Sequence, residues 1–152
     1  MMGRTYRTVL LVVLLLAASP AWPQGAVFDH GELDIQTARA KVHFKVELAT
    51  RTDQQVQGLM FRRTLAPDAG MLFLYDTDHA IEMWMKNTLI PLDMIFIRAD
   101  GTIINIAERT VPQSLATIGS AGPARAVLEV NGGTAQRLGI KPGDRVLYPG
   151  LG

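Results

Sequence analysis

The segment LDMIFIRADGTIINIAER, residues 92–109, contains two stretches rich in isoleucine and other apolar residues, joined by Ala-Asp-Gly-Thr. Such stretches are typical of β-strands. The dipeptide Asp100-Gly101 accepts the left-handed backbone conformation that a tight hairpin turn requires. The segment therefore predicts two antiparallel strands, over residues 92–99 and 102–109, and a fold built largely from hairpins.

Short strands are also predicted on both sides of this hairpin. KVHFKVELAT (41–50) alternates apolar and polar residues, which indicates a half-buried strand with His43 on its solvated face. Apolar or β-branched runs predict further strands at GMLFLY (70–75), AIEMWMKN (80–87), ARAVLEVN (124–131) and RVLYP (145–149).

Two short helices complete the expected fold. TDQQVQGLMFRR (52–63) has Thr52 and Gln55 at the spacing of a capping box, and Val56 and Leu59 on one helical face. GGTAQRLGI (132–140) predicts the second helix. The fold class is therefore mainly β (α+β): an antiparallel β-sandwich or barrel with two short helices and no βαβ rhythm.

The first 21 residues have the layout of a secretory signal peptide, with two arginines, an apolar run, and small residues before a cut after Ala21. We expect residues 22–40 to be an N-terminal tail or edge segment, and residues 41–150 to be one β-rich domain. The apolar run is too short to span a bilayer, so an uncleaved anchor is the less favoured alternative. The protein is then expected in the periplasm or secreted, with no membrane partner after cleavage.

Composition excludes several classes of function. Loss of Arg4 and Arg7 with the leader lowers the formal charge from +1 to −1, and no basic patch remains to bind nucleic acid. The chain has no cysteine, which excludes disulfides, a cysteine nucleophile and thiolate metal ligands. No cofactor is expected, and the sequence does not indicate an oligomeric state.

The segment EMWMKN (82–87) is the best candidate for a binding site. Read as a strand, it places Glu82, Trp84 and Lys86 on one face, which resembles a platform for a sugar ring or another flat ligand. The alternative is a tryptophan covered by a loop. The opposite face, Ile81, Met83, Met85 and Asn87, is expected to point into the core.

Two metal hypotheses are weaker. Met83 and Met85, together with Met60, Met71 and Met94, could supply thioether ligands to Cu(I), although methionine more commonly fills cores. YDTDH (75–79) presents two aspartates and a histidine, but it lacks the pattern of a calcium loop and is expected to be a solvated turn. No metal site is therefore predicted.

An enzymatic role would depend on carboxylates, because the histidines and serines fall in no recognisable nucleophile motif. Asp93, Glu108 and Glu129 lie within apolar strands, where one carboxyl kept protonated and another ionised could perform acid–base chemistry. Alternation places Asp93 with Ile95, and Glu129 with Val127. The structural alternative is that each carboxylate pairs with a base or accepts backbone hydrogen bonds.

Several motifs also resemble one known family. They are GLMFR (58–62), GMLF (70–73), WMKNTLIPLDMIF (84–96), DG (100–101), VLEV (127–130), GG (132–133) and GIKPGD (139–144). In this order they resemble the domain of unknown function 192 family, over about residues 40 to 148. The resemblance implies a small β-sandwich of jelly-roll type, in many members exported from bacteria. The family's characteristic positions correspond to Arg62, Trp84, Lys86, Asn87, Pro91, Asp93 and Glu129. Many members have cysteine in the loop matching residues 110–122, and this chain does not.

We therefore expect an exported domain that binds a small ligand or saccharide in a pocket around Trp84. Glu82 and Lys86 would supply polar contacts, and Arg62, Asn87, Asp93 and Glu129 would lie at or behind the rim. The alternatives are a carboxylate-based hydrolase or lyase acting on envelope material, and a Cu(I)-binding protein.

Overall fold

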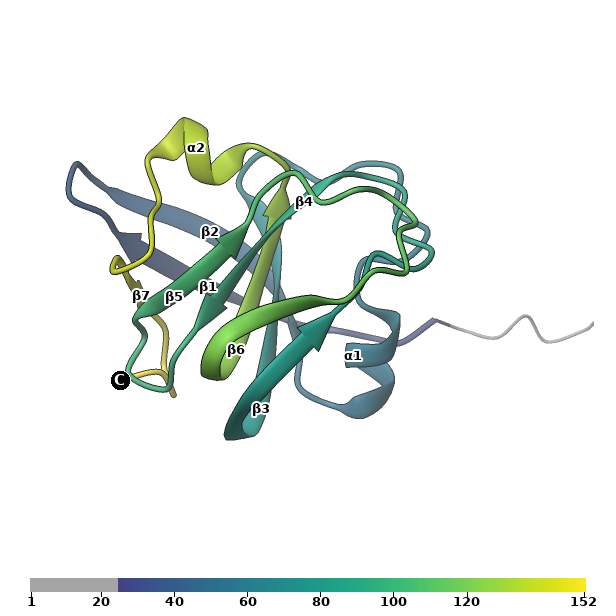
Figure 1. Cartoon of the computed structure of the whole chain (residues 1–152), viewed down its shortest axis with the longest axis horizontal. Helices are drawn as coiled ribbons and strands as arrows, with labels where there is room; N and C mark the ends of the chain where they lie inside the picture. The colour runs from purple at the N-terminus through teal and green to yellow at the C-terminus, as the bar shows by residue number, and fades with distance from the viewer. Residues whose placement is uncertain (1–24) are drawn as a thin grey trace, which may run out of the picture.

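The computed structural model describes residues 25–152 as seven strands and two short helices (Figure 1). In chain order they are β1 (Asp29–Gln36), β2 (Lys41–Ala49), α1 (Thr52–Gln57), β3 (Ala69–Met83), β4 (Leu92–Ile97), β5 (Ile103–Ala107), β6 (Ile118–Asn131), α2 (Thr134–Leu138) and β7 (Arg145–Leu147). The leader predicted over residues 1–21 lies outside the described residues. Within residues 25–152, no helix has the length and apolarity needed to cross a membrane.

The seven strands form one sheet, in the order β5-β4-β6-β3-β2-β1-β7. Every neighbouring pair is antiparallel except β2 and β3, which are parallel and connected through α1. The hairpin predicted at Asp100-Gly101 is confirmed, because β4 pairs with β5 and Gly101 has a φ of +84°. The predicted mainly β fold with two short helices is thus confirmed, and the parallel pair is a feature that the sequence did not indicate.

The sheet curls until its two ends meet. β7 pairs with β1 at one end of the strand order, and the same region bonds back to the start of β5 at the other. The Val146 N–H donates to the Gly101 carbonyl at 2.8 Å, and the Ile103 N–H donates to the Asp144 carbonyl at 2.9 Å. These bonds close one end of the curl.

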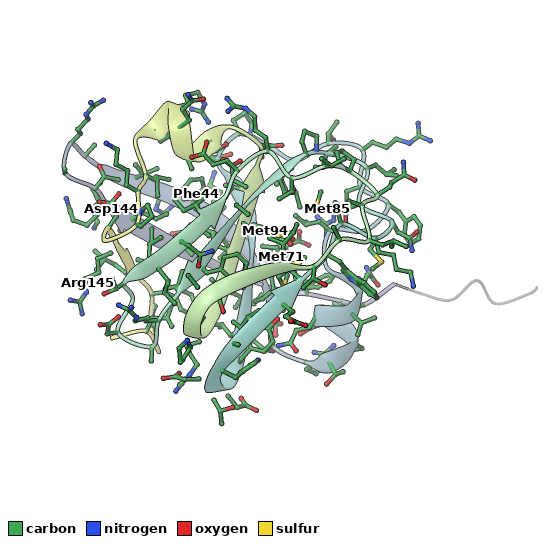
Figure 2. The ribbon with its side chains drawn as sticks, viewed as in Figure 1. Phe44, Met71, Met85, Met94, Asp144 and Arg145 are labelled. Carbon is green, nitrogen blue, oxygen red and sulfur yellow. The ribbon has the colours of Figure 1, made fainter. Side chains whose placement is uncertain are left out.

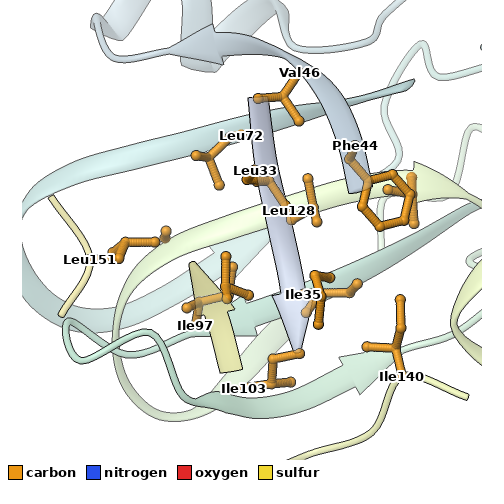
Figure 3. Close-up of a cluster of buried hydrophobic side chains, with 14 of the residues drawn as sticks. Leu33, Ile35, Phe44, Val46, Leu72, Ile97, Ile103, Leu128, Ile140 and Leu151 are labelled. Carbon is orange, nitrogen blue, oxygen red and sulfur yellow. The ribbon is translucent and has the colours of Figure 1, made fainter. Parts of the chain in front are cut away.

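Two apolar clusters lie on opposite faces of this sheet. The inner cluster receives side chains from all seven strands and from α2, among them Ile35, Phe44 and Leu128 (Figure 3). The outer cluster covers the other face of the central strands and contains Phe73 and Phe96. Alternation along β4 explains the division, because neighbouring residues point to opposite faces. The segments that follow α1 and β3 contribute Leu59 and Met85 to the outer cluster.

The first helix begins at Thr52 as predicted, but it is shorter and is capped by a different residue. It ends at Gln57, because Gly58 adopts a φ of +48° and a ψ of −136°, a conformation accessible essentially to glycine alone. The predicted capping partner, Gln55, is wrong. Gln54 takes that role instead: its Oε1 accepts the Arg51 N–H at 3.0 Å, and its Nε2 donates to the Val27 carbonyl at 2.7 Å. Val56 is exposed rather than packed.

Two strands are longer than predicted. β3 runs without a break through the YDTDH segment (75–79), which was expected to be a turn, with a register shift between Leu74 and His79. β6 begins at Ile118, although its first residues include two glycines and Pro123. Gly119 and Pro123 are the register partners of Glu82 and Ala80 on β3, so tertiary pairing outweighs local propensity here. Residues 29–36, predicted as part of a tail or edge segment, form β1.

Candidate ligand-binding site

A pocket of about 270 Å³ opens beside Trp84 on the outer face of the sheet. Its walls come from α1 and the turn after it, from β3, from the segment 84–88, and from Glu129 of β6. The turn after α1 is joined to the segment 84–88 by the Phe61 N–H, which donates to the Asn87 carbonyl at 2.9 Å. The pocket therefore lies where several segments converge on the outer cluster.

Glu129 is the buried acid of this pocket. Its register partners are Met71 on β3 and Met94 on β4, both fully buried, and Glu129 itself is only 4% exposed. Burial raises the pKa of its carboxyl group to about 8, with no other cause among the described residues. Within residues 25–152 the carboxyl group forms no hydrogen bond or ion pair. Its oxygens are nevertheless not completely buried, because no fully buried side-chain oxygen among these residues lacks a hydrogen-bond partner. The oxygens are therefore reachable from the pocket, and the group is mostly uncharged at pH 7.

Tyr75 is the second polar group of the pocket. Burial raises the pKa of its phenol to about 12, and Glu129, which is ionised in the pH range where the phenol titrates, adds to the effect. The Tyr75 hydroxyl donates to the Met83 sulfur at 3.8 Å, and its ring packs edge-on against His79 with centroids 5.0 Å apart. Tyr75 thus adds a neutral hydroxyl to the uncharged acid.

Trp84 forms part of the rim and is 48% exposed, so the alternative of a covered tryptophan is wrong. The reason for its position differs from the prediction, because β3 ends at Met83 and residues 84–88 are not a strand. Lys86 follows in a turn, and its Nζ lies 5.0 Å from the centre of the Trp84 ring. Glu82 is exposed on the last part of β3 and also lines the pocket. The structure thus brings Glu82, Trp84, Lys86 and Glu129 together.

The methionines fall into two groups. Met71, Met85 and Met94 are fully buried in the outer cluster (Figure 2). Met60 and Met83 instead line the pocket. The Met85 sulfur also accepts a hydrogen bond from the Thr110 hydroxyl at 3.1 Å, which fixes its position in the core. The five sulfurs proposed as copper ligands are therefore divided between core and pocket.

In the segment 75–79, Asp78 and His79 make contacts with other residues of the protein. Asp78 pairs with Arg125 at 2.7 Å, and the His79 Nδ1–H donates to the Thr77 carbonyl at 2.9 Å. Among residues 25–152, no three His, Cys, Asp or Glu side chains gather in an arrangement that could hold a metal ion.

Asp93 is buried on the opposite face of the sheet from Glu129. One of its carboxylate oxygens accepts the Arg109 and Gly133 N–H groups, and the other accepts the Ala135 N–H, each at 2.8 Å. Asp93 therefore joins β4 to the loop after β5 and to the start of α2. Glu108 is exposed, near Arg109. The predicted carboxylate pair is not assembled, because Asp93, Glu108 and Glu129 do not share a cleft.

Arg62 and Asn87 also lie outside the pocket lining. Arg62 forms a two-pronged ion pair with Glu47 and stacks over Phe28, beside a separate surface cavity of about 730 Å³. Asn87 has a φ of +55°, which asparagine tolerates better than most residues, and its amide contacts the Met60 sulfur at 3.8 Å. Asn87 thus shapes the turn that carries Lys86. Of the three residues expected at or behind the rim, Asn87 contacts the pocket residue Met60, whereas Arg62 and Asp93 make their polar contacts elsewhere.

Tyr75 and the pocket residues of α1, which include Gln55, were not among the site residues predicted from the sequence. A signal for Tyr75 was present: Met71, Phe73 and Tyr75 alternate along one strand and so share a face. No comparable signal existed for α1, because its contact with the pocket depends on the parallel crossover between β2 and β3.

The family described as "Uncharacterized ACR, COG1430" (DUF192) matches residues 34–148, and the chain belongs to this family. Two crystal structures are similar to it. One, from Sinorhizobium meliloti 1021, is described as a "putative transcription regulator"; it is 47% identical, with a TM-score of 0.80, over 83% of this chain and 98% of that chain. The other is a protein of unknown function from Novosphingobium aromaticivorans DSM 12444. It is 42% identical, with a TM-score of 0.79, over 87% of this chain and 94% of that chain. No curated protein shows significant similarity.

Proposed function

We propose that this protein is a non-catalytic binding domain for a small ligand, and that the ligand occupies the pocket between Trp84 and Glu129. The observation that carries the proposal is the combination of a half-exposed indole at the rim with a buried, uncharged acid below it. Pockets that hold small molecules typically have apolar walls and a few convergent polar groups. Here those groups are Glu129, Tyr75 and the charged ends of Glu82 and Lys86.

Saccharides are the ligand class that the exposed tryptophan first suggests. A sugar ring can stack on an aromatic face while its hydroxyl groups bond to acids, amides and phenols at the edge. Gln55 and Tyr75 line the pocket and would supply such groups through the Gln55 side-chain oxygen and the Tyr75 hydroxyl, since Gln55 Nε2 already donates to the Leu74 carbonyl. The carboxylate-pair alternative has less support, because Glu129 is the one member of the trio that lines this pocket.

A thermal-shift screen tests the proposal. Sugars, cell-wall fragments and metal salts are added to the purified protein, and a ligand at one hundred times its dissociation constant should stabilise it by about 2.7 kcal/mol. Trp84→Ala should abolish the shift. Leu147→Ala, which removes another exposed apolar side chain, on β7 and outside the pocket lining, should leave it unchanged. A response that Trp84→Ala leaves intact would place binding elsewhere, and no response from any class would favour a role in protein interaction.

We also propose that the protein acts outside the cytoplasm, in the periplasm or after secretion. The support is the layout of residues 1–21. N-terminal sequencing of the protein recovered from an expressing bacterium should begin at Trp22. Recovery of the intact N-terminus from the cytoplasm would contradict export.

A further inference from the structure

Glu129 raises a question that stacking on Trp84 does not answer. A buried carboxyl group normally has a hydrogen-bond donor or a base beside it, because leaving such a group unpaired is costly. Asp93, on the other face of the same ladder, has three backbone donors. Glu129 has none within residues 25–152, and it faces a cavity instead.

The walls around this acid have a common chemical character. Phe73, Tyr75 and Trp84 contribute aromatic rings, and Met60 and Met83 contribute polarisable thioethers. Aromatic faces attract ammonium groups through the ring quadrupole, and cages of such rings are a recurring device for binding quaternary ammonium ions. The pocket already shows this attraction at its rim, because the Lys86 ammonium lies 5.0 Å above the Trp84 ring.

The charged groups that face the cavity favour a cation. The titratable groups that line it are Tyr75 and Glu82 from β3, Glu129 from β6 and Lys86 from the segment after β3, whereas α1 contributes only uncharged side chains. Two acids thus stand against one base, and that base is at the rim. An anionic ligand placed against Glu129 would have to be paired by Lys86 at the rim, because no other basic side chain of residues 25–152 lines the pocket.

From these observations we propose that the pocket binds a small organic ammonium ion, with its positive group against Glu129 and its carbon substituents against the aromatic and thioether walls. This inference rests on the proposed function, since it names the ligand class of the same pocket. A volume of about 270 Å³ accommodates a group the size of a quaternary ammonium head.

The proposal couples binding to a proton. Because the pKa of Glu129 is about 8, the free protein holds a proton there at pH 7. Pairing with an ammonium ion favours the ionised form, so the ligand binds as the Glu129 proton leaves to the buffer. Affinity should therefore rise with pH until Glu129 is already ionised in the free protein.

Isothermal titration with choline tests this coupling, because its charge does not change with pH. Choline should bind roughly 10- to 100-fold more weakly at pH 6 than at pH 9. At pH 7, titration in buffers of different ionisation enthalpy should show release of nearly one proton. The neutral isostere 3,3-dimethyl-1-butanol should bind weakly and without pH dependence. At pH 9, n-butylammonium should bind about as tightly as choline.

Matched variants identify the acid. Glu129→Gln should bind choline at all pH values about as weakly as the wild type does at pH 6, whereas Glu82→Gln should keep the pH dependence. The inference is overturned if neither ammonium ion binds, if the neutral isostere binds equally well, or if Glu129→Gln retains the pH dependence. If the protein binds a saccharide, Trp84→Ala abolishes that binding, and no ammonium ion binds, this inference alone is refuted. If neither a saccharide nor an ammonium ion binds, the proposed function is refuted as well.

Discussion

Asp93 and Glu129 are separated by a single register position on the β4–β6 ladder, yet their carboxyl groups lie on opposite faces of the sheet. Asp93 pairs with Val130 and Glu129 with Met94, so the two acids alternate across the pleat. Asp93 accepts three backbone hydrogen bonds in the interior. Glu129 opens into the pocket on the outer face. These two buried acids on the neighbouring strands β4 and β6 therefore have different roles. Asp93 stabilises the fold, and Glu129 lines the candidate site.

Replacing Asp93 should destabilise the protein strongly. Asp93→Asn substitutes an N–H₂ group for one acceptor oxygen and leaves at least one buried backbone N–H unsatisfied. We expect the free energy of unfolding to fall by about 2–4 kcal/mol, measured by urea denaturation. Glu108→Gln is the control, since Glu108 is exposed, and its effect should stay within about 0.5 kcal/mol. Equal effects of the two changes would show that the Asp93 bonds contribute little.

Glu129 should make stability depend on pH. Its pKa is raised from 4.5 to about 8 in the folded state, so the folded protein binds more protons than the unfolded chain between these values. Its contribution is fully present below about pH 4.5 and is lost as pH rises through about 8. The loss should be roughly 3–5 kcal/mol over this window. Glu129→Gln should flatten this part of the curve of unfolding free energy against pH. A variant with the same slope as the wild type would contradict the raised pKa.

The close approach of β3 to β6 should make Gly70 irreplaceable. A Cβ at this position would lie 2.6 Å from the Glu129 carbonyl oxygen, which is fixed in the sheet. Gly70→Ala should therefore lower the free energy of unfolding by about 2–4 kcal/mol and disturb the strand that carries the pocket acid. Gly122→Ala is the matched control, since a Cβ there would meet no atom within 4 Å. Thermal denaturation of the two variants provides the comparison, and a neutral Gly70→Ala would show that the strands can separate.

Trp84 should contribute little to stability despite its size. Half of its surface is exposed, and its ammonium contact with Lys86 is worth about 0.5–1 kcal/mol at an exposed site. Trp84→Ala should therefore cost about 1 kcal/mol or less. Phe73→Ala, which empties a fully buried position in the outer cluster, should cost about 3–5 kcal/mol. If Trp84→Ala proved as costly as Phe73→Ala, Trp84 would be part of the core rather than a ligand surface.

Local sequence signals predicted the hairpin at Asp100-Gly101, because turn chemistry acts within a few residues, and they also indicated the second helix. Alternation also placed Asp93 with Ile95 and Glu129 with Val127, as observed. It could not show that the two acids face opposite ways, because that depends on the register between β4 and β6. The lengths of β3 and β6 were missed for a similar reason: Gly119 and Pro123 pair with Glu82 and Ala80 only because the sheet brings these segments together.

The candidate site was predicted in part. Glu82, Trp84, Lys86 and Glu129 meet in one pocket, although the strand geometry expected for the first three is absent after Met83. Arg62 and Asp93 share the family motifs with Trp84 but make structural contacts elsewhere. A motif in one stretch of chain therefore mixes residues that hold the fold with residues that face a ligand, and only the three-dimensional contacts separate them.

The bonds that join the β7 region to Gly101 and Ile103 have a consequence for association between molecules. Edge strands with free N–H and C=O groups are templates on which other chains can add a strand. At one end of this sheet, the last dozen residues of the chain occupy part of both edges at once. A chain shortened after Lys141 would lose this cover from β1 and β5 together. Such a protein should self-associate at concentrations where the full chain stays dispersed, so the C-terminus protects the sheet against aggregation.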